Sequence, residues 1–376
     1  MRHLFILALF ISSCHSEPQP TPEPTQNVGT TYYQWVDSSR VDDYYGGQRI
    51  VNVQVWYPAD LSDTIKEYPI APYYYKLDQA YDAISWSRSD LEESKQIITS
   101  ARLGAPIANQ SEGYPLLLLS PSLGGNTSHY TYYAERLAAA GFIVAGVNHL
   151  YESLYVIGPE EYVFSVNLTF HDSLKTLDIP KEITADEYRS VKGIRQKVLG
   201  EDLLFALDQL TRINESDFAD LIDTIQVGSW GHSMGGAASV YAAYLDPRIK
   251  AVANLDGTPP SVALAQGIDQ AFLFVEDLKD YKNHQGYSKV HERRTNFCER
   301  IKATSYRILI ADTQHNSFMD FNYRFAASEE ERGEELRVIE QTYSYLATFF
   351  THHLSGVNTP IFTESTTDSL EVFVFP

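Results

Sequence analysis

A serine flanked by glycines is the residue of this chain best suited to covalent chemistry. Gly231-His232-Ser233-Met234-Gly235 follows the pattern G-x-S-x-G. It comes directly after the apolar run 225–230 and directly before an alanine-rich segment, so the pattern predicts a strand, a sharp turn and a helix. Such a turn strains the serine backbone, requires glycines where side chains would collide, and exposes the hydroxyl at the sheet edge. We therefore predict that Ser233 is a nucleophile for acyl transfer.

A serine hydroxyl needs a base, and in this arrangement the acid and then the histidine follow the serine along the chain. His315 lies in a loop after the apolar run that ends at Ala311, where a base at the sheet edge is expected. His149 ends an earlier strand and could line the cleft, but its position in the chain excludes it as the base. The other downstream histidines are explained by solvation or by a helix C-terminus, which favours positive charge: His284, His291, His352 and His353.

Two carboxylates compete for the role of the acid that orients the imidazole. Asp256 ends the apolar run 249–255 and precedes Gly257, and Asp277 with Glu276 ends the next run, 271–275. Both would project from the same sheet edge. Because the choice depends on the spatial order of the strands, the pattern leaves Asp256 and Asp277 open.

An acyl transfer site also needs two backbone amides to stabilise the developing oxyanion. One is expected directly after the nucleophile and the other in the loop after the preceding buried strand. That loop, Ser120-Pro121-Ser122-Leu123-Gly124-Gly125, contains two adjacent glycines, which allow close approach of a ligand. We predict the amides of Leu123 and Met234. No H-E-x-x-H motif or glycine-rich phosphate loop is present, so neither a metal nor a cofactor is predicted.

The elements that must position these residues alternate between strands and helices. Residues 49–57 alternate apolar and polar side chains, which predicts an antiparallel strand with Asn52 and Gln54 on an exposed face. Alternation of continuous apolar runs with helical stripes predicts an α/β fold with a mostly parallel central sheet and helices on both faces. The predicted buried strands are 116–119, 142–147, 225–230, 249–255, 271–275 and 306–311, the predicted helices are 130–138, 199–210, 234–245 and 328–353, and 370–375 is a further candidate strand.

The N-terminal residues predict export. A basic start and a short apolar run indicate a signal peptide over residues 1–13, because a membrane-spanning helix needs about 20 residues. Ile11-Ser12-Ser13-Cys14 resembles a bacterial lipoprotein signal, so Cys14 is predicted to carry the lipid and 14–30 to form a proline-rich tether. The protein would then be a membrane-anchored lipoprotein of the periplasm or cell surface, and otherwise secreted. We predict one domain over 31–376, in which 151–189 is an insertion that could cover a pocket.

Composition excludes several classes of protein. The formal net charge is -20, so no basic surface is expected for nucleic acid or anionic lipid. The chain has two cysteines, too few for a disulfide scaffold.

Together these motifs resemble the α/β-hydrolase superfamily and, within it, the plasma-type platelet-activating factor acetylhydrolases, which are secreted, calcium-independent phospholipases A2. The resemblance rests on scattered motifs between residues 49 and 353. It implies that Asp256 is the acid and that Asp277 is the runner-up. The family has Ser-His-Gly-Leu-Gly where this chain has Ser120-Pro121-Ser122-Leu123-Gly124, a departure in the predicted oxyanion loop. The segments that carry the resemblance are 53–58, 120–124, 141–149, 231–233, 255–256 and 315–321.

The resemblance implies a serine carboxylic-ester hydrolase that cleaves short-acyl or phospholipid esters through an acyl-serine intermediate. The expected partner is a small-molecule or lipid ester. Two alternatives remain. A peptidase or amidase would use the same residues, and a lipoprotein with this fold could act as a non-catalytic binding module.

Overall fold

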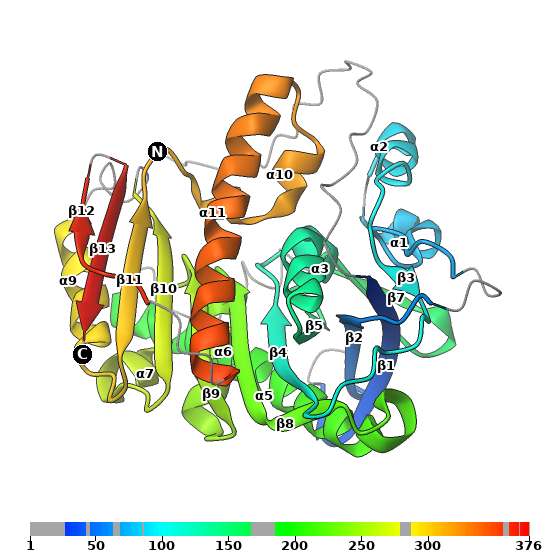
Figure 1. Cartoon of the computed structure of the whole chain (residues 1–376), viewed down its shortest axis with the longest axis horizontal. Helices are drawn as coiled ribbons and strands as arrows, with labels where there is room; N and C mark the ends of the chain where they lie inside the picture. The colour runs from blue at the N-terminus through cyan, green and yellow to red at the C-terminus, as the bar shows by residue number, and fades with distance from the viewer. Residues whose placement is uncertain are drawn as a thin grey trace.

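The computed structural model describes residues 27–42, 46–62, 68–84, 86–166, 185–278, 287–355, 361–367 and 369–375, with the backbone alone for 185–192 and 287. Within these residues one large sheet runs through the molecule in the order β12-β13-β11-β10-β9-β8-β4-β5-β2-β1-β3 (Figure 1). Its strands are β1 (Val28–Val41), β2 (Gln48–Pro58), β3 (Arg102–Leu103), β4 (Tyr114–Ser120), β5 (Ile143–His149), β8 (Ile222–His232), β9 (Ile249–Leu255), β10 (Ala271–Asp277), β11 (Ser305–Ile310), β12 (Ser365–Thr366) and β13 (Leu370–Phe375).

The centre of the sheet is parallel, as the continuous apolar runs predicted. The strands from β5 through β4, β8, β9 and β10 to β11 pair in parallel. Antiparallel strands flank them: β2 pairs with β5 on one side and β13 pairs with β11 on the other. The predicted α/β class with a mostly parallel central sheet is therefore confirmed, and the candidate strand 370–375 is β13.

Helices cover both faces of the sheet (Figure 1). On one face α3 and α11 pack on side chains such as Leu117 and Trp230. On the other face α5, α6 and α9 pack on side chains such as Leu116 and Val252. The helices are α1 (Leu77–Ile84), α2 (Arg88–Ser94), α3 (Thr131–Ala139), α5 (Ala185–Phe218), α6 (Met234–Leu245), α7 (Ser261–Gln266), α9 (Tyr287–Cys298), α10 (Asp320–Arg324) and α11 (Glu329–Leu354), with short 3-10 turns η1 (Thr127–Tyr130), η2 (Pro159–Glu161) and η3 (His315–Phe318).

The prediction for β2 is wrong in one respect. Gln54 is 4% exposed, although alternation placed it on a solvent face. Its amide donates to the hydroxyls of Tyr32 and Thr30, which come from the neighbouring strand β1. Tyr32 stands directly opposite Gln54 in the pairing of β1 with β2, so this face of the sheet gives the amide a partner inside the protein instead of water.

Two predicted boundaries also change. β1 begins at Val28, so the folded part starts before the predicted residue 31, and Val28 is buried. The predicted insertion 151–189 contains a small hairpin of β6 (Tyr155–Ile157) and β7 (Val163–Ser165), and its last five residues belong to α5. Residues 167–184 of the insertion, like the predicted signal peptide and Cys14, lie outside the described residues. Among the described helices none is both long and apolar enough to span a membrane.

Candidate active site

Ser233 lies at the sharp turn between β8 and α6, with a φ of 56°. This left-handed conformation costs a residue with a side chain about 1–3 kcal/mol. Packing explains both glycines of the motif. A Cβ atom on Gly235 would overlap the carbonyl oxygen of Ser120, and one on Gly231 would overlap the same oxygen and the backbone of Gly235. The tight contact between β4 and the start of α6 therefore holds the serine in its strained position.

The structure brings three of the predicted residues into one chain of hydrogen bonds. Nε2 of His315 lies 2.8 Å from Oγ of Ser233, and Nδ1 of His315 lies 2.5 Å from Oδ2 of Asp256. The carboxylate at Nδ1 favours the tautomer with the proton on Nδ1, which leaves Nε2 to accept the serine hydroxyl proton. His315 begins the turn η3 after β11, and Asp256 follows β9.

The electrostatics suit this direction of proton transfer. Burial raises the pKa of Asp256, but the hydrogen bond from His315 and the charge of Arg294 outweigh it and lower the pKa to about 2. Burial lowers the pKa of His315, but the hydrogen bond and charge of Asp256 outweigh it, so the net shift is upward. The charged carboxylate therefore stabilises the imidazolium that forms when His315 takes a proton.

Asp277 lies beside this chain of hydrogen bonds without replacing Asp256 in it. Single ligand atoms of Asp256, Asp277 and His315 all lie within 4.8 Å of one another. Such spacing could admit a metal ion, but both nitrogens of His315 are already in hydrogen bonds with Ser233 and Asp256. Asp256, the acid implied by the resemblance, is the carboxylate that contacts Nδ1.

The other downstream histidines lie elsewhere. His291 contacts Arg307, and His352 and His353 are in the last turn of α11. His284 lies outside the described residues.

The predicted oxyanion amides lie on the two segments that meet at the elbow. Met234 begins α6, and Leu123 lies in the loop after β4. Among the hydrogen bonds of the described residues, neither amide has a partner. Gly124 has a φ of 77° and donates its amide to the carbonyl of Glu152 at 2.6 Å. The left-handed glycine and this bond shape the loop and leave the Leu123 amide available to a ligand.

Tyr130 connects the two halves of the predicted oxyanion site, and pattern analysis of the sequence missed this role. Its hydroxyl accepts a hydrogen bond from the amide of Ser122 at 3.1 Å and lies 2.9 Å from Nδ1 of His232. Ser122 and His232 are the neighbours of Leu123 and Ser233. Tyr130 is fully buried and stands in a helical stripe beside Tyr133, so its spacing indicates a core residue and nothing more.

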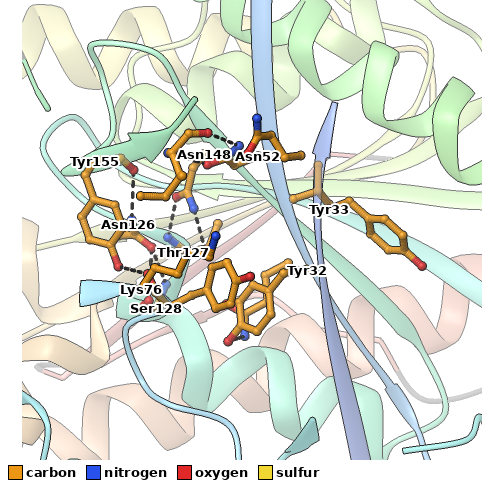
Figure 2. Close-up of a pocket in the computed structure, with 14 residues that line it drawn as sticks. Tyr32, Tyr33, Asn52, Lys76, Asn126, Thr127, Ser128, Asn148 and Tyr155 are labelled. Atoms are coloured by element: carbon orange, nitrogen blue, oxygen red, sulfur yellow. Dashed lines mark hydrogen bonds between the residues drawn. The ribbon is translucent and has the colours of Figure 1, made fainter. Parts of the chain in front are cut away.

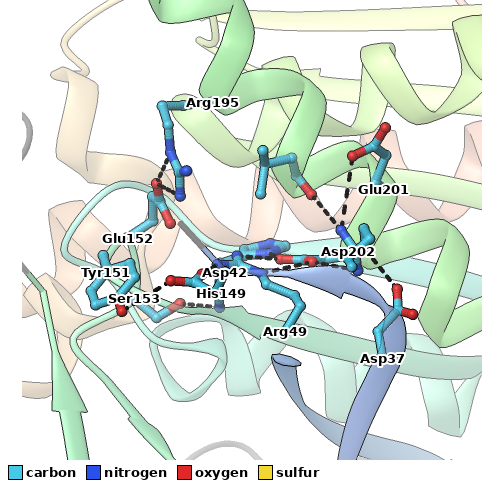
Figure 3. A network of polar contacts seen from close by, with 12 residues as sticks. Asp37, Asp42, Arg49, His149, Tyr151, Glu152, Ser153, Arg195, Glu201 and Asp202 are labelled. Carbon is cyan, nitrogen blue, oxygen red and sulfur yellow. Dashed lines mark hydrogen bonds and ion pairs between the residues drawn. The ribbon is translucent and has the colours of Figure 1, made fainter. Parts of the chain in front are cut away.

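A buried polar network around His149, Asp202 and Arg49 (Figure 3) reaches the strand that precedes this loop. Oγ of Ser120 lies 2.9 Å from Nε2 of His149, and Nδ1 of His149 lies 2.9 Å from Asp202. Arg49 donates two hydrogen bonds to Asp202, at 3.1 and 2.7 Å. The expectation that His149 could line the cleft is wrong: its exposed fraction is 0%, because α5 carries Asp202 over the end of β5.

A separate pocket of about 110 Å³ lies over β1, β2 and β5 (Figure 2). Ser233, Asp256 and His315 do not line it. Its amide side chains are used within the protein: Asn52 bonds to the backbone of Ile157, and Asn148 bonds to Thr127. The pocket therefore does not contain the candidate nucleophile, and its asparagine side chains already have partners within the protein.

Comparison with known proteins agrees with this geometry. The family described as "Platelet-activating factor acetylhydrolase, isoform II" matches residues 38–165. The chain is 26% identical to the platelet-activating factor acetylhydrolase of Cavia porcellus over 239 residues, which are 59% of this chain and 52% of that protein. It is 24% identical to the same enzyme of Canis lupus familiaris over 301 residues, 72% of this chain and 63% of that protein. The chain thus spans between about half and just under two thirds of the length of these relatives.

A solved structure matches over nearly the whole length. The ferulic acid esterase from Streptomyces cinnamoneus superposes with a TM-score of 0.73 at 25% identity, covering 95% of this chain and 98% of the esterase. The parallel sheet, the strained elbow and these similarities lead to one conclusion: the chain has the α/β-hydrolase fold and is similar to the platelet-activating factor acetylhydrolases.

Proposed function

We propose that this protein hydrolyses carboxylic esters with Ser233 as the nucleophile and His315 as the general base. The observation that carries the proposal is the continuous chain of hydrogen bonds from Ser233 through His315 to Asp256 at a strained turn. The similarity to platelet-activating factor acetylhydrolases over part of their length supports the proposal, and so does the fold shared with the ferulic acid esterase. The charged, buried cluster behind His315 supports it as well, since such tuning is typical of active sites.

The mechanism follows from the atoms in contact. His315 removes the hydroxyl proton through Nε2 while Ser233 attacks the ester carbonyl, and Asp256 stabilises the imidazolium. The amides of Leu123 and Met234 would hold the tetrahedral oxyanion, each lowering the barrier by roughly 3 kcal/mol. His315 then donates the proton to the leaving alcohol. In the second half of the reaction His315 takes a proton from water, which attacks the acyl-serine, and then gives that proton to Oγ of Ser233, so that the carboxylic acid leaves and the free enzyme is restored.

Replacement of the nucleophile tests the proposal. The purified protein should hydrolyse p-nitrophenyl acetate or butyrate, and Ser233→Ala should lower kcat by about a millionfold, as loss of a triad serine does. Ser239→Ala is the matched control, because Ser239 is a buried serine of the adjoining helix α6. Full activity in Ser233→Ala would exclude the proposed nucleophile. Labelling with a fluorophosphonate and locating the adduct by mass spectrometry gives an independent answer.

The substrate class is the second part of the proposal. We infer a short-acyl or phospholipid ester, supported by the similarity to platelet-activating factor acetylhydrolases. The solved neighbour acts on ferulic acid esters, so an aromatic acyl group is the specific competitor. A series of acetyl, long-acyl, feruloyl and matching amide substrates separates these classes by kcat/KM. Preference for the amide would favour the peptidase alternative, and no turnover with any of them would favour a binding module.

We also propose that the protein is exported and anchored through a lipid on Cys14. The support is the short apolar run followed by Ile11-Ser12-Ser13-Cys14 and the proline-rich segment after it. Mass spectrometry of the N-terminal peptide from membranes should find acyl chains on Cys14 as the first residue. An unmodified mature terminus at another residue would contradict the anchor without affecting the proposed chemistry.

A further inference from the structure

Two carboxyl groups converge on the imidazole of His315. β9 and β10 are parallel neighbours, and the amide of Asp256 donates to the carbonyl of Val275 at 2.8 Å. Asp256 and Asp277 therefore leave the sheet at the same edge. One oxygen of each carboxyl group and one nitrogen of His315 lie within 4.8 Å of one another. Asp256 is 8% exposed and Asp277 is 3% exposed, so both act on the imidazole with little screening by water.

Asp256 is held by His315 and Arg294, and Asp277 stands next to it as a further hydrogen-bond partner. Oδ2 of Asp256 contacts Nδ1 of His315, and Oδ1 accepts a hydrogen bond from Arg294 at 3.1 Å. Arg294 also pairs with Glu276, which in turn pairs with Arg307. This arginine network pairs with Glu276 and Asp256, and Asp277 adds a further carboxyl group to the cluster within 4.8 Å of the imidazole.

The surroundings of His315 place the carboxyl group of Asp277 where its charge would raise the pKa of the imidazole. The groups around the ring are Ser233, Asp256, Asp277, Arg294 and the ring of His232, whose centroid lies 4.8 Å from that of His315. Burial lowers the pKa of His315, whereas the hydrogen bond and charge of Asp256, followed by the charge of Asp277, raise it. Asp277 thus favours the imidazolium from a second direction.

We propose that Asp277 is a second positioning carboxylate for His315, which accepts the hydrogen bond from Nδ1–H when Asp256 is absent. The proposal rests on the ester-hydrolase function proposed above. In this arrangement Nδ1 keeps its proton and Nε2 still accepts the proton of Ser233, so the reaction needs no other change. Removal of the Asp256 side chain ends its hydrogen bond with Asp277 and leaves a space beside Nδ1, into which rotation would bring the Asp277 carboxyl group.

Paired substitutions test the proposal. Loss of a triad aspartate lowers kcat by about 10⁴-fold. We expect Asp256→Ala to lose only about a hundredfold, and the double variant Asp256→Ala/Asp277→Asn to fall at least tenfold further. The control is Asp256→Ala/Asp269→Asn, which removes the same charge from an aspartate that is 70% exposed and paired with Lys302. Its activity should equal that of Asp256→Ala. If Asp256→Ala does not fold, Asp256→Gly replaces it throughout, because glycine leaves the same space and suits the φ of 50° at this position.

Two outcomes would overturn the proposal. One is equal activity of Asp256→Ala with and without Asp277→Asn, and the other is a loss of about 10⁴-fold already in Asp256→Ala. A merely structural role of Asp277 would lower thermal stability without moving the pKa of His315. We therefore expect NMR titration of the histidine rings to give a lower pKa for His315 in Asp277→Asn than in wild type or Asp269→Asn, and an unchanged pKa would contradict the proposal.

The two proposals fail in different ways. Retention of turnover in Ser233→Ala would contradict the ester-hydrolase function. The titration of His315 needs no substrate, so it still decides whether Asp277 acts on the imidazole in that case.

Discussion

Ser233 shows how few residues set the chemistry at the smallest scale. Its φ of 56° is unfavourable for a residue with a Cβ atom, and it is imposed by contacts that only glycine permits at positions 231 and 235. The hydroxyl then meets Nε2 of His315 at 2.8 Å. The side chain that does the chemistry is therefore positioned by residues that have no side chain.

Gly235→Ala should destabilise the protein and abolish turnover. The added methyl group would overlap the carbonyl oxygens of Ser120 and Pro121, which are backbone atoms of a central strand and its loop. We expect a loss of about 1–3 kcal/mol in the free energy of unfolding, measured by urea denaturation. Gly333→Ala in α11 is the matched control, because nothing lies within 4 Å of its added Cβ. It should stabilise the helix by roughly 0.5–1 kcal/mol, and equal effects of the two substitutions would contradict this explanation.

Tyr130→Phe should lower kcat while changing KM little. The substitution removes the hydroxyl that accepts a hydrogen bond from the Ser122 amide and contacts His232. The predicted oxyanion loop therefore loses its link to the turn at Ser233. We expect a loss between about tenfold and a hundredfold, below the 10²–10³-fold cost of a missing oxyanion donor. Tyr133→Phe is the control, since Tyr133 also packs against Trp230 from helix α3. Similar kinetics in both variants would show that Tyr130 acts only through packing.

At the scale of elements, a buried ion network joins strands and helices that are distant along the chain. Arg49 on β2 and Asp202 on α5 are 2% and 0% exposed. Arg40 on β1 also lies 2.9 Å from Asp202. Through His149 the network reaches Ser120 at the end of β4. The helix is thereby attached to the strand that supplies the loop beside the nucleophile (Figure 3).

Arg49→Ala should destabilise the fold strongly. Removal of one partner leaves the buried carboxylate of Asp202 with less compensation, and such losses cost about 3–5 kcal/mol. Because Arg40 remains beside Asp202, we expect a loss in the free energy of unfolding of about 3 kcal/mol, the lower end of that range. Replacement of the pair by Met and Leu should recover part of the loss, since the carboxylate of Asp202 is removed while Asp42, which also pairs with Arg49, keeps its buried charge. Lys302→Ala, in a pair whose side chains are 72% and 70% exposed, should cost less than about 1 kcal/mol.

The whole molecule contains buried histidines that should make its stability depend on pH. Burial lowers the pKa of His129 and of His232 to about 3, below the value of about 6.5 in an unfolded chain. A lowered pKa means that the folded state favours the neutral imidazole, whereas the unfolded chain takes up a proton below about pH 6.5. The stability that comes from keeping these histidines neutral is therefore complete above about pH 6.5 and is lost as the pH falls from there towards 3.

The free energy of unfolding should fall by about 1.4 kcal/mol per pH unit for each of these histidines below about pH 6.5. The raised pKa of buried Glu135, about 7, works in the opposite direction, so the comparison must be made between variants. Urea denaturation at about pH 7 and about pH 5 should show a smaller difference for His129→Gln/His232→Gln than for wild type. An equal difference would mean that these histidines are not buried in the neutral form.

Much of the framework follows from local patterns. The run 225–230, the glycines around Ser233 and the alanine-rich segment after it predicted a strand, an elbow and a helix, and β8 and α6 lie there. Leu199, Leu203 and Leu207 predicted a helix face, and all three are fully buried on α5. These features were predictable because periodicity and steric limits act between residues close together in the chain.

Other features depend on partners that are far apart in the sequence. Strand order decides that Asp256 reaches Nδ1 of His315 while Asp277 stays beside it. Arg49 donates hydrogen bonds to Asp202, which is 153 positions away in the sequence, and Tyr130 contacts His232, which is 102 positions away. No local pattern encodes these pairs, because burial makes each polar group depend on whichever partner the assembled sheet and helices bring to it. The amino-acid sequence thus determined which residues could react, and the tertiary structure decided which polar groups hold and orient them.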